Sequence, residues 1–248
     1  MNPLLLALST LTLLPVSPKQ WRPSEVRLSA AFYPLVGALL GALFALASKV
    51  QLAHDLRTIL VLLAWVLATG AFHLDGLSDC LDGFFGGRDP KDRRRIMKDP
   101  SVGAYGVTGI VLVLVLKAML LSRLLSEPGD WKYLILIPWA ARWGVTLACT
   151  FFRSPPGDKG LGSQVLGLEG YGLAIPTFVS LAGGWWLLRA PSLGYFLAAG
   201  LVAMAVGLLS RARIQGLTGD GMGAIIETSE VALLFLACAN FSKGWMPF

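Results

Sequence analysis

Charged residues are scarce in this chain of 248 residues, and their scarcity argues against an ordinary soluble domain. Asp, Glu, Lys and Arg make up 15% of the sequence, whereas a soluble domain has about 25%. Hydrophobic residues make up 55%, and they come in blocks of about 20, the length that spans a bilayer. The composition therefore predicts an all-α, polytopic membrane bundle that forms one domain over residues 1–248.

Cysteine is also scarce, which argues against two kinds of site. Cys80, Cys149 and Cys238 are an odd, scattered set without a Cys-x-x-Cys pair. Neither a disulfide framework nor a zinc site is expected, and each cysteine is interpreted as a small packing residue. The sequence has no obvious internal repeat, no low-complexity tract and no linker long enough to divide it.

The apolar segment 3–14 lacks the marks of a removed signal peptide. It has no basic residues before it and no Ala-x-Ala cleavage site. At about 12 residues it is too short to cross a bilayer, and Pro15 and Pro18 would end a helix here. We predict a short N-terminal helix that lies at the membrane interface or is half inserted.

Seven apolar segments are long enough to cross a membrane as helices. They are residues 31–50, 57–74, 104–125, 132–152, 171–189, 192–210 and 225–241. Seven spans would place on one side the connections 15–30, 75–103, 153–170 and 211–224. These connections hold thirteen of the 21 Lys and Arg residues, so this side should face the cytoplasm. We predict a multi-pass protein of the bacterial inner membrane, surrounded by lipid and with no nucleic-acid partner. Glycine-rich spans such as 37–41 would permit close helix contacts, including those of a homo-oligomer.

Three aspartates at the end of the second apolar segment are the clearest sign of a site. Asp75, Asp79 and Asp82 have i, i+4, i+7 spacing, which on a helix places them within an arc of roughly 60°. At about 6 Å and an effective dielectric near 20, each neighbouring pair repels by on the order of 3 kcal/mol. Water, cationic side chains or a metal must offset this repulsion. Because the ligands are hard oxygens and His73 falls on the opposite face, Mg²⁺ is the expected metal.

Glycines flank the aspartates and cations follow them. Gly76 and Gly83 would let a phosphate or another helix approach closely. Six Lys and Arg residues then lie within eleven positions, a density that suits a polyphosphate substrate or the anionic head groups of lipids. Arg93 and Lys98 are the candidates for substrate binding, and Asp99 is a candidate metal ligand.

Arg142 lies inside an apolar segment, where an unpaired guanidinium costs at least about 2.5–3.5 kcal/mol. It therefore needs an anionic partner, and three kinds are considered: a substrate phosphate, one of the clustered acids, or a structural ion-pair partner. Lys117 also lies within an apolar segment and is interpreted as snorkelling or paired inside the bundle.

The glycine-rich segment 216–224 precedes the last apolar span. Its backbone N–H groups, including that of Gly219, would cradle phosphate oxygens near a helix N-terminus, although a flexible turn has the same pattern. Asp220 would add a metal ligand, and Glu227 and Glu230, one helical turn apart, would face the bundle interior and contact substrate. This segment shares one side of the membrane with the aspartates and with another glycine-rich connection, which predicts a composite site.

Several motifs follow one another along nearly the whole chain. They are His73-x-Asp75-Gly76-Leu77-x-Asp79-x-x-Asp82-Gly83, Ile96-Met97-Lys98-Asp99 with Gly103-x-Tyr105-Gly106, Gly160-Leu161-Gly162, and Thr218-Gly219-Asp220-x-x-Gly223-Ala224 followed by Glu227 and Glu230. Together with segments 10–18 and 32–37, this series resembles the cobalamin synthase family, whose members are adenosylcobinamide-GDP ribazoletransferases.

The resemblance implies a Mg²⁺-dependent transfer at the inner membrane. The ribose hydroxyl of α-ribazole, or of its 5′-phosphate, would attack the cobinamide-linked phosphorus of adenosylcobinamide-GDP and displace GMP. Displacement at a phosphoanhydride depends mostly on charge neutralisation and in-line positioning. We therefore expect Asp75, Asp79 and Asp82 to hold one or two Mg²⁺ ions, with Asp82 as the candidate general base.

Two other classes of protein have to be distinguished. CDP-alcohol phosphotransferases of phospholipid synthesis use metals similarly, but they carry Asp-x-x-Asp-Gly-x-x-Ala-Arg, whereas Asp75 and Asp79 are four apart and no Ala-Arg follows. A cation carrier would favour broken helices in mid-membrane, whereas these acids gather at one surface beside cations.

Overall fold

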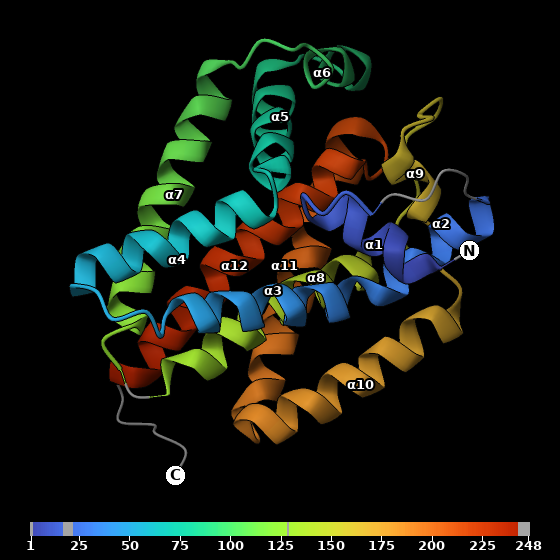
Figure 1. Ribbon diagram of the computed structural model, residues 1–248. Helices are drawn as coiled ribbons and strands as arrows, with labels where there is room; N and C mark the ends of the chain where they lie inside the picture. The colour runs from blue at the N-terminus through green and yellow to red at the C-terminus, as the bar shows by residue number, and fades with distance from the viewer. Residues whose placement is uncertain (1, 17–21, 128, 243–248) are drawn as a thin grey trace.

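The computed structural model describes residues 2–16, 22–127 and 129–242, and all the regular structure within them is helical (Figure 1). The helices are α1 (Pro3–Leu11), α2 (Pro23–Ser29), the short 3₁₀ helix η1 (Ala30–Phe32), α3 (Tyr33–Ala47), α4 (His54–Ala68), α5 (Phe72–Gly86), α6 (Pro90–Ile96), α7 (Ala104–Leu124), α8 (Asp130–Phe151), α9 (Leu161–Val165), α10 (Gly170–Leu188), α11 (Pro191–Ile214) and α12 (Gly219–Ser242). The prediction of an all-α bundle is confirmed.

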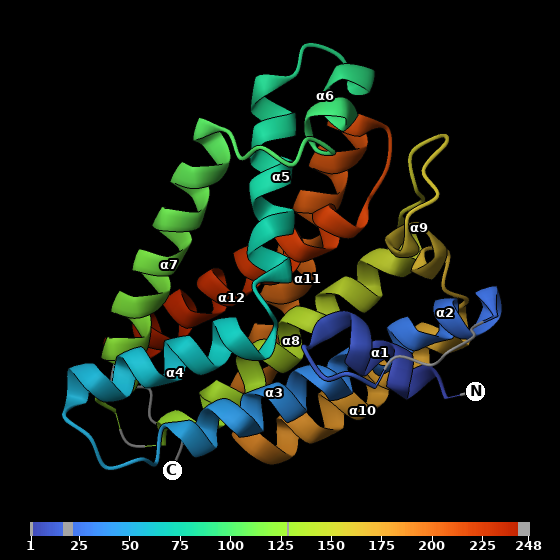
Figure 2. The ribbon, with the colours of Figure 1, turned by 45° about the horizontal axis from the view of Figure 1, so that its top comes forward.

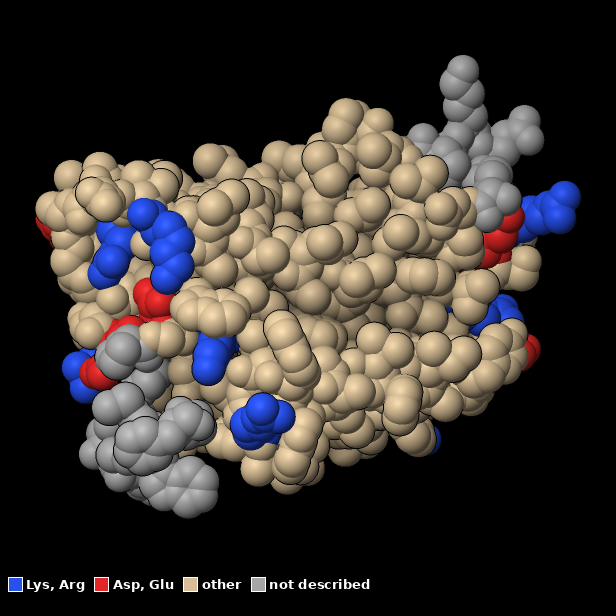
Figure 3. All heavy atoms as spheres, turned by 60° about the horizontal axis from the view of Figure 1, so that its bottom comes forward, with Lys and Arg blue, Asp and Glu red and all other residues tan. Residues whose placement is uncertain are grey.

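In the part of the chain that the structure describes, six long helices are apolar enough to cross a membrane, and one bent pair of shorter helices makes a seventh candidate. The six are α2 with α3, then α7, α8, α10, α11 and α12, and the bent pair is α4 with α5. Large apolar side chains on these helices are exposed, among them Phe178 at 74% and Trp186 at 78%. Figure 3 shows a broad uncharged band, with most of the visible charged residues towards its ends. Such a surface fits lipid, so a multi-pass architecture is confirmed.

The second predicted span, 57–74, is not one straight helix. α4 ends at Ala68 and α5 begins at Phe72, with a bend of 78° between them. Between the two helices Gly70 and Ala71 have left-handed φ angles of 61° and 58°, which interrupts a right-handed helix. The aspartates therefore lie on a separate helix that turns away from the apolar one, rather than on its continuation (Figure 2).

α8 runs through the core of the bundle, and α3 packs closely against it because Gly37 and Gly41 have no side chains. An added Cβ on Gly37 would lie 2.9 Å from the Cα of Trp139, and one on Gly41 would lie 2.6 Å from the Cα of Ile135. Membrane helices commonly approach one another at small residues in this way. These glycines join two helices of the same chain, so they do not offer a contact for a second copy.

The predicted N-terminal helix is present as α1, which ends at Leu11, ahead of Pro15. Pro18, the second expected helix stop, lies outside the described residues. α1 buries one face against the bundle. The segment after it contacts the end of α4, where the Leu13 N–H donates to the carbonyl oxygen of Ala68 at 3.0 Å. α1 thus lies beside the bend from which the acidic helix α5 starts.

Candidate active site

The acidic helix α5 stands at the end of the molecule that also carries α6, α9 and the start of α12 (Figures 1 and 2). Its three aspartates differ in their surroundings. Asp75 is exposed, Asp79 is half-buried and Asp82 is buried, with 8% of its surface exposed. The three acids that the sequence places on one helical face therefore do not have equal access to a ligand.

Asp82 forms hydrogen bonds to the start of α7. Its carboxylate accepts the backbone N–H groups of Gly103, at 2.8 Å, and Gly106, at 2.9 Å. These groups belong to the first turn of α7, where N–H groups lack partners within the helix and a negative charge is favoured. An added Cβ on either glycine would overlap the Asp82 side chain. The structure thus shows Asp82 as a cap of α7, and its expected role as general base stays a prediction.

Asp75 and Asp79 are joined by Asp220, from the first turn of α12. α5 and α12 touch at Gly76, where an added Cβ would lie 2.8 Å from the carbonyl oxygen of Asp220. A Cβ on Gly223 would likewise lie 3.1 Å from the backbone of α5. This approach places Asp220 within electrostatic range of both Asp75 and Asp79. Gly76, a predicted substrate-binding position, therefore admits a helix.

Two other glycines predicted to bind substrate also set the spacing between segments. An added Cβ on Gly83 would lie 3.0 Å from the carbonyl oxygen of Arg93, so Gly83 lets α6 approach α5. Gly219 lies against Gly162 of α9, where an added Cβ on Gly162 would lie 2.6 Å from the Gly219 Cα. Of Gly76, Gly83 and Gly219, only Gly219 also lines the cavity described next.

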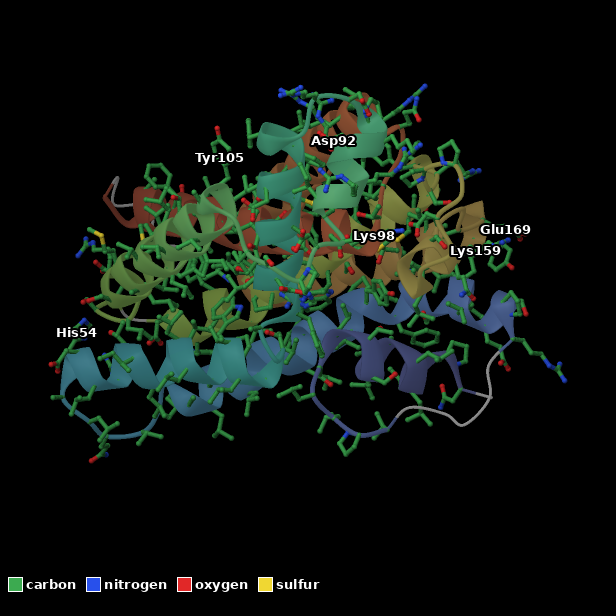
Figure 4. The ribbon with its side chains drawn as sticks, turned by 90° about the horizontal axis from the view of Figure 1, so that it is seen from above. His54, Asp92, Lys98, Tyr105, Lys159 and Glu169 are labelled. Carbon is green, nitrogen blue, oxygen red and sulfur yellow. The ribbon has the colours of Figure 1, made fainter. Side chains whose placement is uncertain are left out.

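A cavity of about 540 Å³, which we call the basic cavity, opens beside Asp220. Its wall comes from the end of α6, the connection before α9 and the start of α12. Arg94, Lys98 and Lys159 line it, together with Asp158. Figure 4 shows Lys98 and Lys159 close to each other at this end of the molecule. Cations and acids that line one cavity suit a phosphate-bearing ligand with its metal.

The donor set beside the basic cavity fits Mg²⁺. The carboxylates of Asp75 and Asp79 have no hydrogen bond or ion pair with any residue that the structure describes. Across the described ranges, no three His, Cys, Asp or Glu side chains close around one point as a complete metal cage. Mg²⁺ usually keeps several waters and binds through one or two carboxylates together with substrate phosphates. Unneutralised oxygen donors, one exposed and one half-buried, near a phosphate-sized cavity match that chemistry.

Arg93 was expected to contact substrate. In the structure it forms hydrogen bonds to the end of α5 and to α11. Its guanidinium donates to the carbonyl oxygens of Gly87, at 3.1 Å, and Arg213, at 3.2 Å. Arg94 donates to the carbonyl oxygen of Ile214 at 2.8 Å. Both arginines thus satisfy carbonyl groups at the C-terminal end of α11, where cations are favoured. Arg93 does not line the basic cavity, whereas its neighbour Arg94 does.

Asp99, an expected metal ligand, lies apart from the other acids. It is exposed, and its Oδ1 accepts the backbone N–H of Ser101 at 2.9 Å. That hydrogen bond lowers the pKa of Asp99 below its ordinary value. Asp99 does not line the basic cavity, so the structure does not bring it to the site.

A buried ion cluster accounts for Arg142, Glu227 and Glu230. Arg142 pairs with Glu230. Lys117 of α7 donates to Glu227 at 2.7 Å and to Glu230 at 2.5 Å, and the indole N–H of Trp65 donates to Glu230 at 2.8 Å. Two cations balance two acids, as buried charges require. Of the partners considered for Arg142, the structural ion pair is the one present, and these residues belong to the bundle core rather than to the cavity wall.

Asp158 and Lys159 are site residues that the sequence analysis did not single out. They occupy the connection between Gly157 and Gly160, and Gly157 has a φ of 80°, which favours glycine. The sequence did offer one indication of a site here, because two charged residues lie between glycines in a connection on the side rich in Lys and Arg. Nothing in their spacing relates them to α5, because only the fold brings them to Asp220.

Comparison with known proteins gives one consistent result. Residues 3–238 match the family described as cobalamin-5-phosphate synthase. A relative from Brevibacillus brevis named adenosylcobinamide-GDP ribazoletransferase is 35% identical over 248 residues, which cover 97% of this chain and 99% of the relative. Relatives with the same name occur in Pseudomonas putida (strain GB-1), 38% identical over 94% of this chain and 97% of their own, and in Prosthecochloris aestuarii, 34% identical over 92% and 93%. No solved structure matches the chain.

Proposed function

The chain belongs to the cobalamin-5-phosphate synthase family, and we propose that it transfers the adenosylcobinamide phosphoryl group from adenosylcobinamide-GDP to α-ribazole or α-ribazole 5′-phosphate. GMP leaves, and adenosylcobalamin or its 5′-phosphate forms. The shared name of the relatives specifies a GDP-linked donor and a ribazole acceptor for those proteins. The same reaction in this chain would belong to the last steps of cobalamin biosynthesis.

The observation that supports the proposal is that unneutralised acids lie close to a basic cavity. Asp75 and Asp79 have no partner in the described part of the chain, and both lie within electrostatic range of Asp220. Asp220 in turn lines the basic cavity, as Lys98 and Lys159 do. A diphosphate brings negative charge to such cations, and a divalent cation can link its oxygens to the acids. A helix end that merely contacts water needs neither feature.

Asp79 and Asp220 would hold Mg²⁺, which when bound neutralises charge on the diphosphate and orients it for in-line displacement. Lys98 and Lys159 bind nonbridging phosphate oxygens from the cavity wall. Asp75, which is exposed and has no partner among the described residues, accepts the proton of the attacking hydroxyl at a carboxylate oxygen.

The end of the molecule that carries these residues is proposed to face the cytoplasm. The connections predicted to share its side of the membrane hold thirteen of the 21 Lys and Arg residues, an imbalance that orients membrane proteins with the basic side inside. Attachment of the acceptor would then take place on the cytoplasmic surface of the inner membrane, with the apolar helices in lipid.

Purified membranes that contain the chain test this proposal directly. With adenosylcobinamide-GDP and α-ribazole, or its 5′-phosphate, we expect GMP release that EDTA stops and added Mg²⁺ restores. CDP-diacylglycerol with a phospholipid-type acceptor should release no CMP, which separates this reaction from that of CDP-alcohol phosphotransferases. A cation carrier would release no nucleotide from either donor. Failure to release GMP with both ribazole acceptors would refute the transfer reaction.

A further inference from the structure

A second cavity, of about 440 Å³, adjoins the basic cavity, and we call it the apolar cavity. It lies among α1, α5, α9, α12 and the start of α3. Its lining is mostly hydrophobic and includes Leu6, Tyr33, Val165 and Met222. Among its described lining residues there is no Lys or Arg, whereas three cations line the basic cavity. The two cavities therefore suit ligands of opposite character.

A thin wall separates the two cavities. Leu161, Gly162, Gly219 and Asp220 line both of them. At this wall Gly162 and Gly219 are so close that an added Cβ on Gly162 would lie 2.6 Å from the Gly219 Cα. A ligand in one cavity and a ligand in the other would thus meet beside Asp220.

Two polar side chains that line the apolar cavity, His73 and Asp75, have unpartnered polar atoms in the described part of the chain, and His73 is the buried one of the two. His73 is buried, with 5% of its surface exposed, and its Nε2 forms no hydrogen bond within the described ranges. Asp75, two residues after His73 on α5, lines the same cavity. An unpaired polar atom in a buried position costs about 1–3 kcal/mol. A hydroxyl group on a bound molecule would supply the missing partner.

We propose that the apolar cavity binds the aromatic base and ribose of the acceptor, and that the basic cavity binds the GDP part of the donor. This inference rests on the proposed function. The base of ribazole is an uncharged, methylated bicyclic ring, which matches a mostly apolar pocket with a few polar groups. The ribose hydroxyls provide the hydrogen-bonding groups that His73 lacks. GDP carries a diphosphate, which matches Arg94, Lys98 and Lys159.

The division between cavities places the reacting atoms at the shared wall. The attacking ribose oxygen forms a bond to the cobinamide-linked phosphorus. The bond from that phosphorus to the bridging oxygen breaks, and GMP keeps this oxygen with its electron pair. The proton of the hydroxyl passes to a carboxylate oxygen of Asp75, which lines the acceptor's cavity.

Two matched cysteine variants test the assignment. Ser9 lines only the apolar cavity and Ser163 only the basic cavity, and both are half-buried. α-Ribazole at about ten times its dissociation constant should slow maleimide labelling of Ser9→Cys about tenfold, because roughly a tenth of the sites stays empty. It should leave Ser163→Cys unchanged, and GDP should have the reverse effect. The unsubstituted chain, whose Cys80 and Cys149 are buried, supplies the background.

Protection in the opposite pattern, or no protection of either variant, would overturn the assignment. Steady-state kinetics add a second test with His73→Asn. We expect the KM for α-ribazole to rise about tenfold, because one hydrogen bond to the acceptor is lost, while the KM for adenosylcobinamide-GDP stays the same. An equal rise in both KM values would indicate a structural role for His73 and would also overturn the proposal. The proposed function fails separately, if the unsubstituted chain releases no GMP.

Discussion

Gly76 of α5 lies against the backbone of Asp220 in α12, closer than a residue with a side chain could come. An added Cβ would lie 2.8 Å from the Asp220 carbonyl oxygen and 2.9 Å from its Cα. Asp75 and Asp79 belong to the same stretch of α5 as Gly76. The contact therefore sets how far the acids of α5 lie from the acid of α12.

Gly76→Ala should push the two helices apart and disturb the site. We expect GMP release to fall on the order of 100-fold, because a displacement of about 1 Å has this effect at a positioned site. The extra methyl group should also lower the free energy of unfolding by roughly 1–3 kcal/mol. Gly86→Ala on the same helix is the control, since its added Cβ would only contact the Ile96 Cδ1 at 3.8 Å. Equal activity of the two variants would show that the Gly76 contact does not set the geometry.

Asp79→Asn should abolish turnover while membrane insertion stays normal. The substitution removes the charge of a proposed metal-holding carboxylate, so we expect about 100-fold or greater loss of GMP release, since a metal's charge stabilisation is worth several kcal/mol. Binding of Mn²⁺, measured by electron paramagnetic resonance, should weaken in parallel. Asp55→Asn, an exposed acid at the start of α4, should change neither quantity. Normal activity in Asp79→Asn would contradict the metal role.

Asp82→Asn separates a helix cap from a general base. Because the Asp82 carboxylate accepts from Gly103 and Gly106, its loss of charge should lower the free energy of unfolding by about 1–3 kcal/mol. Below its unfolding temperature the variant should retain turnover. Thermal unfolding in detergent and GMP release at low temperature measure the two effects. An unchanged unfolding temperature with no turnover would instead favour the general-base role that the sequence suggested.

The buried ion cluster predicts a stability effect that depends on charge balance. Glu227→Gln leaves Lys117 and Arg142 with one remaining acid, Glu230, and should cost roughly 3–5 kcal/mol of unfolding free energy. Adding Lys117→Met to that variant restores equal numbers of buried charges and should recover part of the loss. Thermal unfolding of the single and double variants in the same detergent provides the comparison. A double variant less stable than the single one would argue against charge balance as the cause.

The lysines of the basic cavity predict an effect on donor binding. Lys98→Gln or Lys159→Gln removes one charged hydrogen bond to the diphosphate, so we expect the KM for adenosylcobinamide-GDP to rise at least about tenfold. The KM for α-ribazole should stay the same, because the acceptor is assigned to the other cavity. Lys91→Gln, an exposed position on α6 outside both cavities, is the control.

Much of the architecture could be predicted from the chain alone. Apolar blocks of bilayer length predicted the multi-pass helical bundle, because burial in lipid requires long helices whose backbone groups are satisfied internally. The bend after α4 could not be predicted in this way, since the left-handed φ of Ala71 belongs to a residue type that rarely adopts it. Hydropathy alone predicted one segment, 57–74, that continues from α4 into the first residues of α5.

The candidate site could be predicted less completely, since the same residue patterns serve different purposes. Spacing placed Asp82 beside Asp79 on one face, yet spacing cannot reveal that Gly103 and Gly106 reach Asp82 from across the fold. The cost of a buried charge predicted that Arg142 has an anionic partner. Which acid it pairs with depends on how α8 meets α12, and this is decided by packing among segments far apart in the sequence.

The order of residues along the chain gives the ion cluster a consequence for biosynthesis. Lys117 and Arg142 lie on α7 and α8, whereas both acids that neutralise them lie on α12. During translation the two cations enter the membrane before α12 is made, and they have no acidic partner until that helix inserts. Assembly of the bundle is thereby coupled to completion of α12, because a product without this helix would leave both cations unpaired inside the membrane, at a cost in free energy.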